Sequence, residues 1–205
     1  MVPAVDGPIA KLIGSYESEL HGAVMAIIRQ RPPVIVNIGC AEGFYAVGLA
    51  RACPRSTIHA FDVERTNRRR CAQLASLNGV ANRVHVHSAC TEGSLMQLPL
   101  ANAAIVADCE GCEAEVFSPT AVSALDGATI LIEVHEGEYT DMLPKLMGRF
   151  EATHTAEVTP SRGRDWEDYP ELTELRAEER MLALDEFRPE TMRWLLLRSR
   201  RSTAP

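Results

Sequence analysis

Two short acidic segments carry side chains that can do proton chemistry. Asp108-Cys109-Glu110-Gly111-Cys112-Glu113 and Glu133-Val134-His135 each follow an apolar run of strand character. An unperturbed imidazole titrates near pH 6.5, so His135 is suited to act as a general base, with Asp108 and Glu133 as its catalytic neighbours. The alternative is that His135 only caps the strand end and hydrogen-bonds to Glu133.

The same side chains raise the question of a metal ion. Asp108, Glu110, Glu133 and His135 offer oxygen ligands and one imidazole, a set that suits magnesium or manganese better than zinc. We favour proton chemistry and predict no metal at this site.

Cysteines are expected to play a structural role. Cys109-x-x-Cys112 has redox or zinc-pair spacing, but a lone pair without a second one is weak for zinc. All six cysteines of the chain are expected to be reduced, because disulfides are rare in intracellular enzymes.

A glycine-rich turn stands upstream of these segments. The apolar run from Val34 leads into Asn37-x-Gly39-x-Ala41-x-Gly43, and a helical pattern follows. Small residues there let a ligand approach the backbone, and the helix points its partly positive end at the same place. Asp62 ends the next strand pattern, where its carboxylate can accept hydrogen bonds from ribose hydroxyls. The unit is predicted to be a βαβ nucleoside-binding half.

The glycine spacing resembles motif I of the class I S-adenosylmethionine-dependent methyltransferases, in which Asn37 takes the place of the usual acidic residue. The resemblance implies S-adenosylmethionine as cofactor and S-adenosylhomocysteine as product. It also implies that the methionine end and ribose lie against the turn and Asp62, and that the adenine lies near the end of the third strand. The expected cofactor-binding residues are Asn37, Gly39, Ala41, Gly43, Asp62, Val63, Ala89, Cys90 and Asp108.

A narrower resemblance covers the acidic segments. The element at residues 108–113 is similar to the D-V-E-G-x-E element of FkbM-type methyltransferases, and Glu133-Val134-His135 resembles their I-E-x-H. The resemblance runs from about residue 34 to residue 154. It implies a Rossmann-like α/β fold, with a seven-stranded, mostly parallel sheet and helices on both faces. It also implies O-methylation of a small-molecule or sugar-like acceptor.

The elements that must position these groups follow in order. Residues 1–205 are expected to form a single domain, in which the N-terminal part, residues 1–31, is mainly one helix from 9 to 29. Strands are expected at 34–38, 57–62, 83–88, 101–107, 129–134, 153–159 and 192–197, and helices at 44–52, 65–78, 140–147 and within 172–187. An insertion at 160–190, before the last strand, is expected to be a lid or partner surface.

A pair of histidines stands apart from the acidic segments. His85 and His87 alternate with Val84 and Val86, so both imidazoles face one side of a strand. Such a pair can bind a metal, but no third ligand is near in sequence, and a structural role is favoured.

Composition limits the classes of partner. The chain has 205 residues, 46% of them hydrophobic, a net charge of −7 and a pI near 5.4. An acidic protein is a poor match for a nucleic-acid backbone, so no nucleic-acid partner is expected. No secretory signal pattern and no apolar run long enough for a membrane span is evident, so a cytoplasmic protein without a membrane partner is expected.

The predicted function is therefore an S-adenosylmethionine-dependent methyltransferase of EC class 2.1.1. Asp62 would also suit the ribose of NAD, which keeps a nicotinamide oxidoreductase as an alternative, although the chain lacks G-x-G-x-x-G and Tyr-x-x-x-Lys. A non-catalytic module that retains the nucleoside pocket is the third alternative, for which Asn37 is the hint.

Overall fold

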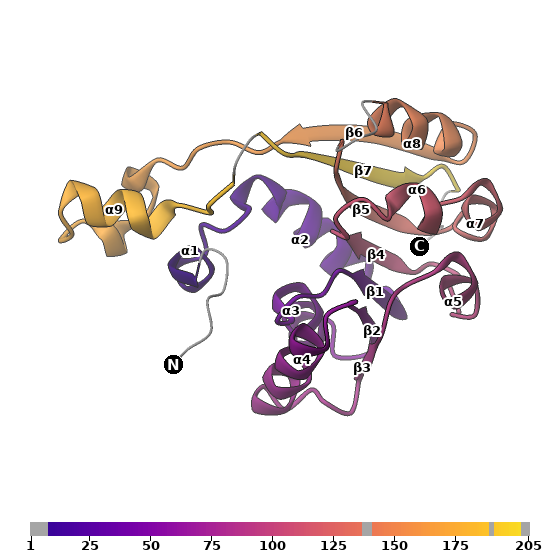
Figure 1. The fold of residues 1–205 in the computed structure, drawn as a ribbon, viewed down its shortest axis with the longest axis horizontal. Helices are drawn as coiled ribbons and strands as arrows, with labels where there is room; N and C mark the ends of the chain where they lie inside the picture. The colour runs from indigo at the N-terminus through magenta and orange to yellow at the C-terminus, as the bar shows by residue number, and fades with distance from the viewer. Residues whose placement is uncertain (1–7, 137–140, 189–190, 202–205) are drawn as a thin grey trace.

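The protein is described by a computed structural model, which covers residues 8–136, 141–188 and 191–201. Within these ranges seven strands form one sheet in the order β3-β2-β1-β4-β5-β7-β6 (Figure 1). The strands are β1 (Val34–Ile38), β2 (Thr57–Phe61), β3 (Val84–His87), β4 (Ala104–Ala107), β5 (Thr129–Val134), β6 (His154–Pro160) and β7 (Arg193–Ser199).

Six of the seven described strands run in the same direction, and β7 runs opposite to them. β1 pairs in parallel with β2 and β4, β2 with β3, and β4 with β5, whereas β7 runs antiparallel to both β5 and β6. The central strands are buried along their whole length, which explains why β1 and β5 read as nearly continuous apolar runs. The predicted fold class, a mostly parallel seven-stranded α/β sheet, is confirmed.

Helices cover both faces of the sheet. One core packs α2 (His21–Gln30), α3 (Phe44–Ala52) and α4 (Arg65–Leu77) against one face. The opposite core packs α5 (Glu92–Met96), α6 (Glu113–Val116), α7 (Pro119–Ala124) and α8 (Met142–Phe150) against the other. Alternate residues of each strand enter opposite cores, as the two-residue period of a strand requires. The carboxyl ends of β1, β2, β4 and β5 therefore meet at one edge.

The N-terminal helix is broken in two. Where the sequence predicts one helix over 9–29, the structure has α1 (Pro8–Ile13), a 3-10 turn η1 (Ser18–Leu20) and α2. Gly14 and Glu17 both take left-handed backbone angles, with φ of 76° and 48°, and neither continues a right-handed helix. The break directs Tyr16 and Glu17 toward the carboxyl ends of the strands instead of along the helix.

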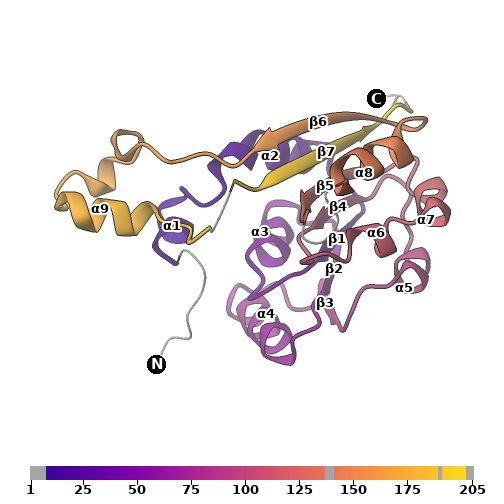
Figure 2. The same cartoon turned by 45° about the horizontal axis from the view of Figure 1, so that its top comes forward.

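An arm lies between β6 and β7. It contains η2 (Trp166–Asp168), η3 (Pro170–Leu172) and α9 (Ala177–Leu184), which is shorter than the helical stretch predicted within 172–187. Figures 1 and 2 show α9 projecting away from the sheet, beside α1, and α1 and α9 are in contact. The arm extends the β6–β7 pair, residues 189 and 190 lie outside the described ranges, and a role as lid or partner surface stays a prediction.

Several boundaries differ modestly from the prediction. β4 starts at Ala104, later than expected, and α8 extends to Phe150, while Thr140, the first residue of the expected helix, lies outside the described residues. The short helices α5, α6 and α7 were not predicted, because runs of four to six residues carry too little periodicity to detect. Among the described residues, no helix has the length and apolar character to cross a membrane.

Candidate active site

A pocket of about 500 Å³ opens at the carboxyl ends of the parallel strands. Its walls come from the segments that follow β1, β2, β3 and β4, and two N-terminal side chains complete it. The lining residues are Lys11, Tyr16, Ile38, Gly39, Ala41, Glu42, Phe61, Asp62, Val63, Glu64, Asn67, Ala89, Cys90, Thr91, Asp108, Cys109, Glu110, Cys112 and Glu115. Seven of the nine predicted cofactor-binding residues are in this set, and the remaining two, Asn37 and Gly43, are not.

The turn after β1 depends on Gly39. This residue has a φ of 74°, and a Cβ built there would lie 1.5 Å from the backbone oxygen of Asp108. Because no side chain fits in that space, the segments after β1 and β4 can approach each other closely only with glycine. The amides of Gly39 and Cys40 both donate to the carbonyl of Phe61, which fastens the turn to β2.

Asn37 and Gly43 serve the frame of the turn. The buried Asn37 donates from Nδ2 to the carbonyl of Val106 on β4, at 3.3 Å. Gly43 is the N-cap of α3, with a φ of 101°, and a Cβ there would press on Cys71 of α4. Both residues therefore fix the geometry of the β1–α3 turn from behind the pocket wall.

Asp62 links the two halves of the nucleoside-binding unit. Its Oδ2 accepts from the amide of Ala41 at 2.8 Å, and its Oδ1 accepts from the amide of Glu64 at 2.8 Å. Asn67 lies 3.3 Å from both oxygens. A carboxylate oxygen can accept more than one hydrogen bond, so Asp62 can hold the turn and still face the pocket.

The third wall follows β3. Ala89 and Cys90 line the pocket, and Thr91 begins α5 with a capping box to Ser94. Burial raises the pKa of the Cys90 thiol to about 11, which keeps it protonated at neutral pH. This wall is therefore neutral and partly apolar, unlike the rest of the pocket.

Acidic side chains dominate the pocket. Six carboxylates line it, from Glu42, Asp62, Glu64, Asp108, Glu110 and Glu115, and Lys11 is the one cation among its described lining residues. Lys11 is itself paired with Glu42 at 2.6 Å. The pocket consequently has a negative potential, which attracts cationic ligands and repels phosphates.

His135 lies beside this pocket in a cluster of carboxylates. Its Nδ1 lies 2.7 Å from Oε1 of the fully buried Glu113, and its Nε2 lies 3.5 Å from carboxylate oxygens of Asp108 and Glu110. The predicted capping partner, Glu133, is replaced by Glu113, which α6 brings under the imidazole from the segment after β4.

The cluster changes the acid–base properties of His135. Burial alone would lower the pKa of the imidazole, but the hydrogen bond and charge of Glu113, together with Asp108 and Glu110, raise it to about 9. His135 is therefore an imidazolium at neutral pH. The expectation of an unperturbed imidazole that takes up a proton near pH 6.5 is wrong for this arrangement.

Asp108 is the better proton acceptor of the cluster. Burial raises the pKa of its carboxyl to about 6, partly offset by the nearby His135. Its Oδ1 is buried and has no hydrogen-bond partner among the described residues. This oxygen faces Nε2 of His135 at 3.5 Å, beyond ordinary hydrogen-bond distance. Because the carboxyl group also lines the pocket, it can accept a proton from a ligand bound there.

Glu133 belongs to a second ionic cluster, at the base of the arm. Arg188 contacts Glu133 at 2.6 Å and Glu186 at 2.9 Å, and it also pairs with the buried Glu17. Tyr45 donates a hydrogen bond to Glu17. Burial raises the pKa of Glu17 and of Glu133 to about 7. Arg188 thus ties the break after α1, the end of β5 and the arm together.

Potential metal ligands do converge here. Ligand atoms of Asp108, Glu133 and His135 lie within 4.8 Å of one another. Two cations already neutralise this group, because Arg188 pairs with Glu133 and His135 is protonated at neutral pH. Glu110, the fourth residue considered as a ligand, approaches only His135 and is largely exposed.

Cys109 and Cys112 are joined by a disulfide, so the expectation that all six cysteines are reduced is wrong for this pair. The other four, Cys40, Cys53, Cys71 and Cys90, are free. The disulfide closes the segment that carries Asp108, Glu110 and Glu113 and fixes how these three carboxylates are presented. Close spacing in a turn, in which Glu110 and Gly111 have positive φ, brings the two sulfurs together.

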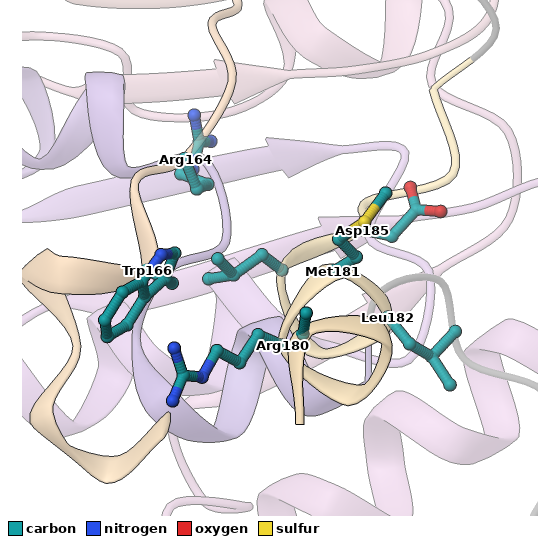
Figure 3. Close-up of a pocket in the computed structure, with 8 residues that line it drawn as sticks. Arg164, Trp166, Arg180, Met181, Leu182 and Asp185 are labelled. Atoms are coloured by element: carbon teal, nitrogen blue, oxygen red, sulfur yellow. The ribbon is translucent and has the colours of Figure 1, made fainter. Parts of the chain in front are cut away.

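A second hollow, of about 540 Å³, lies on the arm (Figure 3). Its eight lining residues come from 164–166 and 177–185, and none of them lines the pocket at the strand ends. The guanidinium of Arg180 stacks over the Trp166 ring at 3.9 Å, and Met181 and Leu182 are mostly exposed. This hollow carries none of the acid–base groups described above.

Some residues of the site were not predicted. Glu113 belongs to the acidic element at 108–113, but its contact with His135 was not predicted. Lys11, Glu17 and Arg188 have no local signal, because backbone reversal at the α1 break and the return of the arm bring them in from distant parts of the chain.

No protein-family model matches the chain, and no curated protein matches it in sequence. Solved structures do match its fold. A precorrin-6y C5,15-methyltransferase from Geobacter metallireducens superposes with a TM-score of 0.57 at 14% identity, covering 90% of this chain and 88% of its own. An O-methyltransferase from Bacillus cereus, in complex with SAH, gives 0.57 at 13% identity, covering 96% and 92%.

A third match is the O-methyltransferase TomG from Streptomyces achromogenes, solved in complex with SAM. It gives a TM-score of 0.56 at 15% identity, covering 95% of this chain and 82% of its own. At these identities the likeness concerns the fold. The chain has the architecture of the Rossmann-like methyltransferases, and the FkbM resemblance stays a prediction.

Proposed function

We propose that this protein is an S-adenosylmethionine-dependent methyltransferase that transfers a methyl group to an oxygen of a small molecule. The proposal rests on the pocket at the strand ends. The methyltransferase neighbours share the fold that forms such a pocket, and two of them were solved with SAM or SAH.

The acidic lining is the observation that carries the proposal. S-adenosylmethionine brings a sulfonium and an ammonium, whereas NAD brings a pyrophosphate with two negative charges. Six carboxylates against one paired lysine favour the cationic ligand and disfavour the phosphates. The same lining therefore argues against the nicotinamide alternative, independently of the glycine spacing.

The residues fit the proposed cofactor in three places. Asp62 offers carboxylate oxygens for ribose hydroxyls, the turn at Gly39 and Ala41 lines the pocket for the methionine end, and the neutral wall at Ala89 and Cys90 suits the adenine. When bound, the cofactor would supply an electrophilic methyl carbon, and its sulfur would be the leaving group.

Asp108 is proposed as the group that takes the acceptor's proton. It has a buried oxygen that makes no hydrogen bond among the described residues, its pKa is about 6, and it lies in the pocket wall. His135, held protonated by Glu113, lies 3.5 Å from Asp108 and stabilises its ionised form. In this assignment His135 positions and charges the base, and Glu133 supports the cluster through Arg188.

The direct test is ligand-dependent thermal unfolding of the purified protein. S-adenosylhomocysteine, S-adenosylmethionine and NAD are compared, each with and without magnesium. A ligand at about one hundred times its dissociation constant adds roughly 2.7 kcal/mol, which raises the midpoint by several degrees in a protein of this size. We expect a shift with the adenosyl compounds only, which magnesium does not enlarge.

Each other outcome has a meaning. A shift with NAD alone would overturn the proposal in favour of an oxidoreductase. A magnesium-dependent shift would place a metal at Asp108, Glu133 and His135. A shift with the adenosyl compounds, but no methyl transfer to any of a broad panel of hydroxyl acceptors, would favour the non-catalytic alternative.

A further inference from the structure

Three histidines gather on one face of β2 and β3, outside the site described above. His59 of β2 pairs directly with His85 of β3, and His87 lies two residues further along β3. Residues two apart in a strand, and cross-strand partners, share a face of the sheet. The pair seen in the sequence, His85 and His87, thus gains a third imidazole from the neighbouring strand.

The nitrogens of two of these rings already have the spacing of metal ligands. Nδ1 of His59 lies 3.0 Å from Nε2 of His87, and the two rings are stacked with centroids 5.3 Å apart. Nitrogens that share one first-row metal ion at about 2.0–2.1 Å lie roughly 3.0–3.4 Å from each other. The two strands therefore hold one nitrogen of each imidazole at the separation expected for two ligands of the same metal ion.

His85 can supply the third ligand. Its ring lies 5.5 Å from that of His59, centroid to centroid, tilted by 32°. The side chain is exposed, so it can rotate toward the other two without displacing core atoms. β3 is the end strand of the sheet among the described residues, so no further strand covers its outer edge there.

The charge state of the cluster also suits a metal ion. Burial lowers the pKa of His59 and of His87 below the ordinary value, and the neighbouring imidazoles lower it further. In the described part of the chain, every ion pair of a histidine involves His135 and none involves these three. The lowered pKa values of His59 and His87 favour their neutral forms, in which an imidazole nitrogen can bind a cation.

We propose that His59, His85 and His87 form a binding site for a divalent transition-metal ion of the class that prefers imidazole, such as zinc, nickel or copper. The ion replaces the proton that the His59–His87 hydrogen bond now holds between the two nitrogens. That proton moves to the outer nitrogen of the same ring, so no net release is required. A hard ion such as magnesium finds no oxygen ligand here.

The site adjoins the candidate cofactor pocket without overlapping it. The ring of Phe61, which lines the pocket, stacks on His87 with centroids 4.7 Å apart. None of the three histidines lines the pocket. A bound ion would therefore link β2 to β3 next to the pocket. The proposal does not depend on whether the protein is a methyltransferase.

The test is a calorimetric titration of nickel chloride into the untagged protein, with millimolar magnesium present to occupy carboxylate sites. We expect saturable binding of one nickel ion per chain. His59→Gln and His87→Gln should each weaken binding at least about tenfold, because each removes one of the two preset ligands. His85→Gln should weaken it as well, and its exposed position makes this variant safe for folding.

Two control variants locate the ion. His135→Gln removes the imidazole of the carboxylate cluster, and His21→Gln removes an exposed imidazole of α2. Both should bind nickel as the wild type does. Absence of saturable binding would overturn the proposal, as would wild-type affinity in His85→Gln and His87→Gln. A loss confined to His135→Gln would place the ion in the carboxylate cluster instead.

Discussion

At the scale of single residues, the chemistry depends on what surrounds each carboxyl and imidazole. His135 was predicted from its type and place, but its pKa of about 9 comes from Glu113, a partner that the sequence does not identify. Asp108, with a pKa of about 6, is better matched to proton uptake near neutral pH. The residue types show which groups can take up a proton, and the burial and neighbours of each group set its pKa.

Asp62 allows a direct test of the ribose assignment. Asp62→Asn keeps the shape of the side chain and one acceptor oxygen, but it loses the charge and the second acceptor. Charge-assisted hydrogen bonds are worth roughly 1.5–3 kcal/mol, so we expect affinity for S-adenosylhomocysteine to fall about tenfold or more in a calorimetric titration. Because Asp62 also accepts from the amide of Ala41, the unliganded midpoint of unfolding must be measured alongside.

Glu92→Gln changes a half-buried carboxylate at the start of α5 outside the pocket lining; it is the matched control and should bind as the wild type does. If Asp62→Asn retains wild-type affinity, Asp62 only braces the turn after β1 and the ribose lies elsewhere.

At the scale of elements, the strands were easier to predict than the helices. β1 and β5 are buried on both faces, and their apolar runs marked them within one residue. The prediction of one N-terminal helix was wrong because apolar residues continue at helical spacing across residues 14–17. The backbone there takes left-handed angles at Gly14 and Glu17. The helix bounds in the arm were predicted too long. The helices of the arm cover little of the core, so their sequence is not amphipathic enough to mark where they end.

Arg188 is expected to anchor the arm to the sheet. Arg188→Met removes the partner of the buried Glu17 and Glu133, and leaving buried charges unpaired costs about 3–5 kcal/mol. We expect a clear drop in the midpoint of unfolding and faster limited proteolysis within 160–188. Because burial already raises the pKa of both glutamates to about 7, part of the loss should be recovered at pH 5.5, where they are protonated.

Arg176→Met is the matched control for Arg188→Met. Arg176 lies in the same arm, but its pair with Glu179 is exposed, so its loss should change neither the midpoint nor the cleavage rate. Equal proteolysis of the two variants would show that the arm is held by its own packing and not by the ionic cluster.

At the scale of the whole molecule, the fold follows from patterns that run along the chain, whereas the site follows from contacts between distant parts of it. The apolar runs marked the strands, the resemblance to methyltransferases implied the Rossmann-like sheet, and the glycine turn predicted a pocket at its carboxyl edge. Lys11, Glu17 and Arg188 come to that edge from both ends of the chain. Their roles rest on tertiary contacts that no local pattern encodes.

The stability of the molecule should depend on pH through these same contacts. The pKa of His135 is raised from 6.5 to about 9, so its contribution is fully present below pH 6.5 and is lost as pH rises through 9. Glu17 and Glu133 act in the same direction, but their loss is centred near pH 7, where they are half ionised. The pKa values of His59, His87 and His154 are lowered, so these residues make the protein less stable as pH falls below 6.5.

The interval from pH 7 to 9 contains most of the loss at His135, and substitutions separate it from the remaining titration of Glu17 and Glu133. A shift of this size corresponds to about 3 kcal/mol, so the wild-type midpoint should fall by several degrees across the interval in a buffer series. His135→Gln should flatten that slope. Glu113→Gln should flatten it too, because the hydrogen bond that raises the pKa then loses its charge, whereas Glu157→Gln, at an exposed ion pair on β6, should retain the wild-type slope. If His135→Gln leaves the slope unchanged, the imidazolium is not stabilised by the carboxylates around it. Asp108 would then lack the charged neighbour that is proposed to keep it ionised.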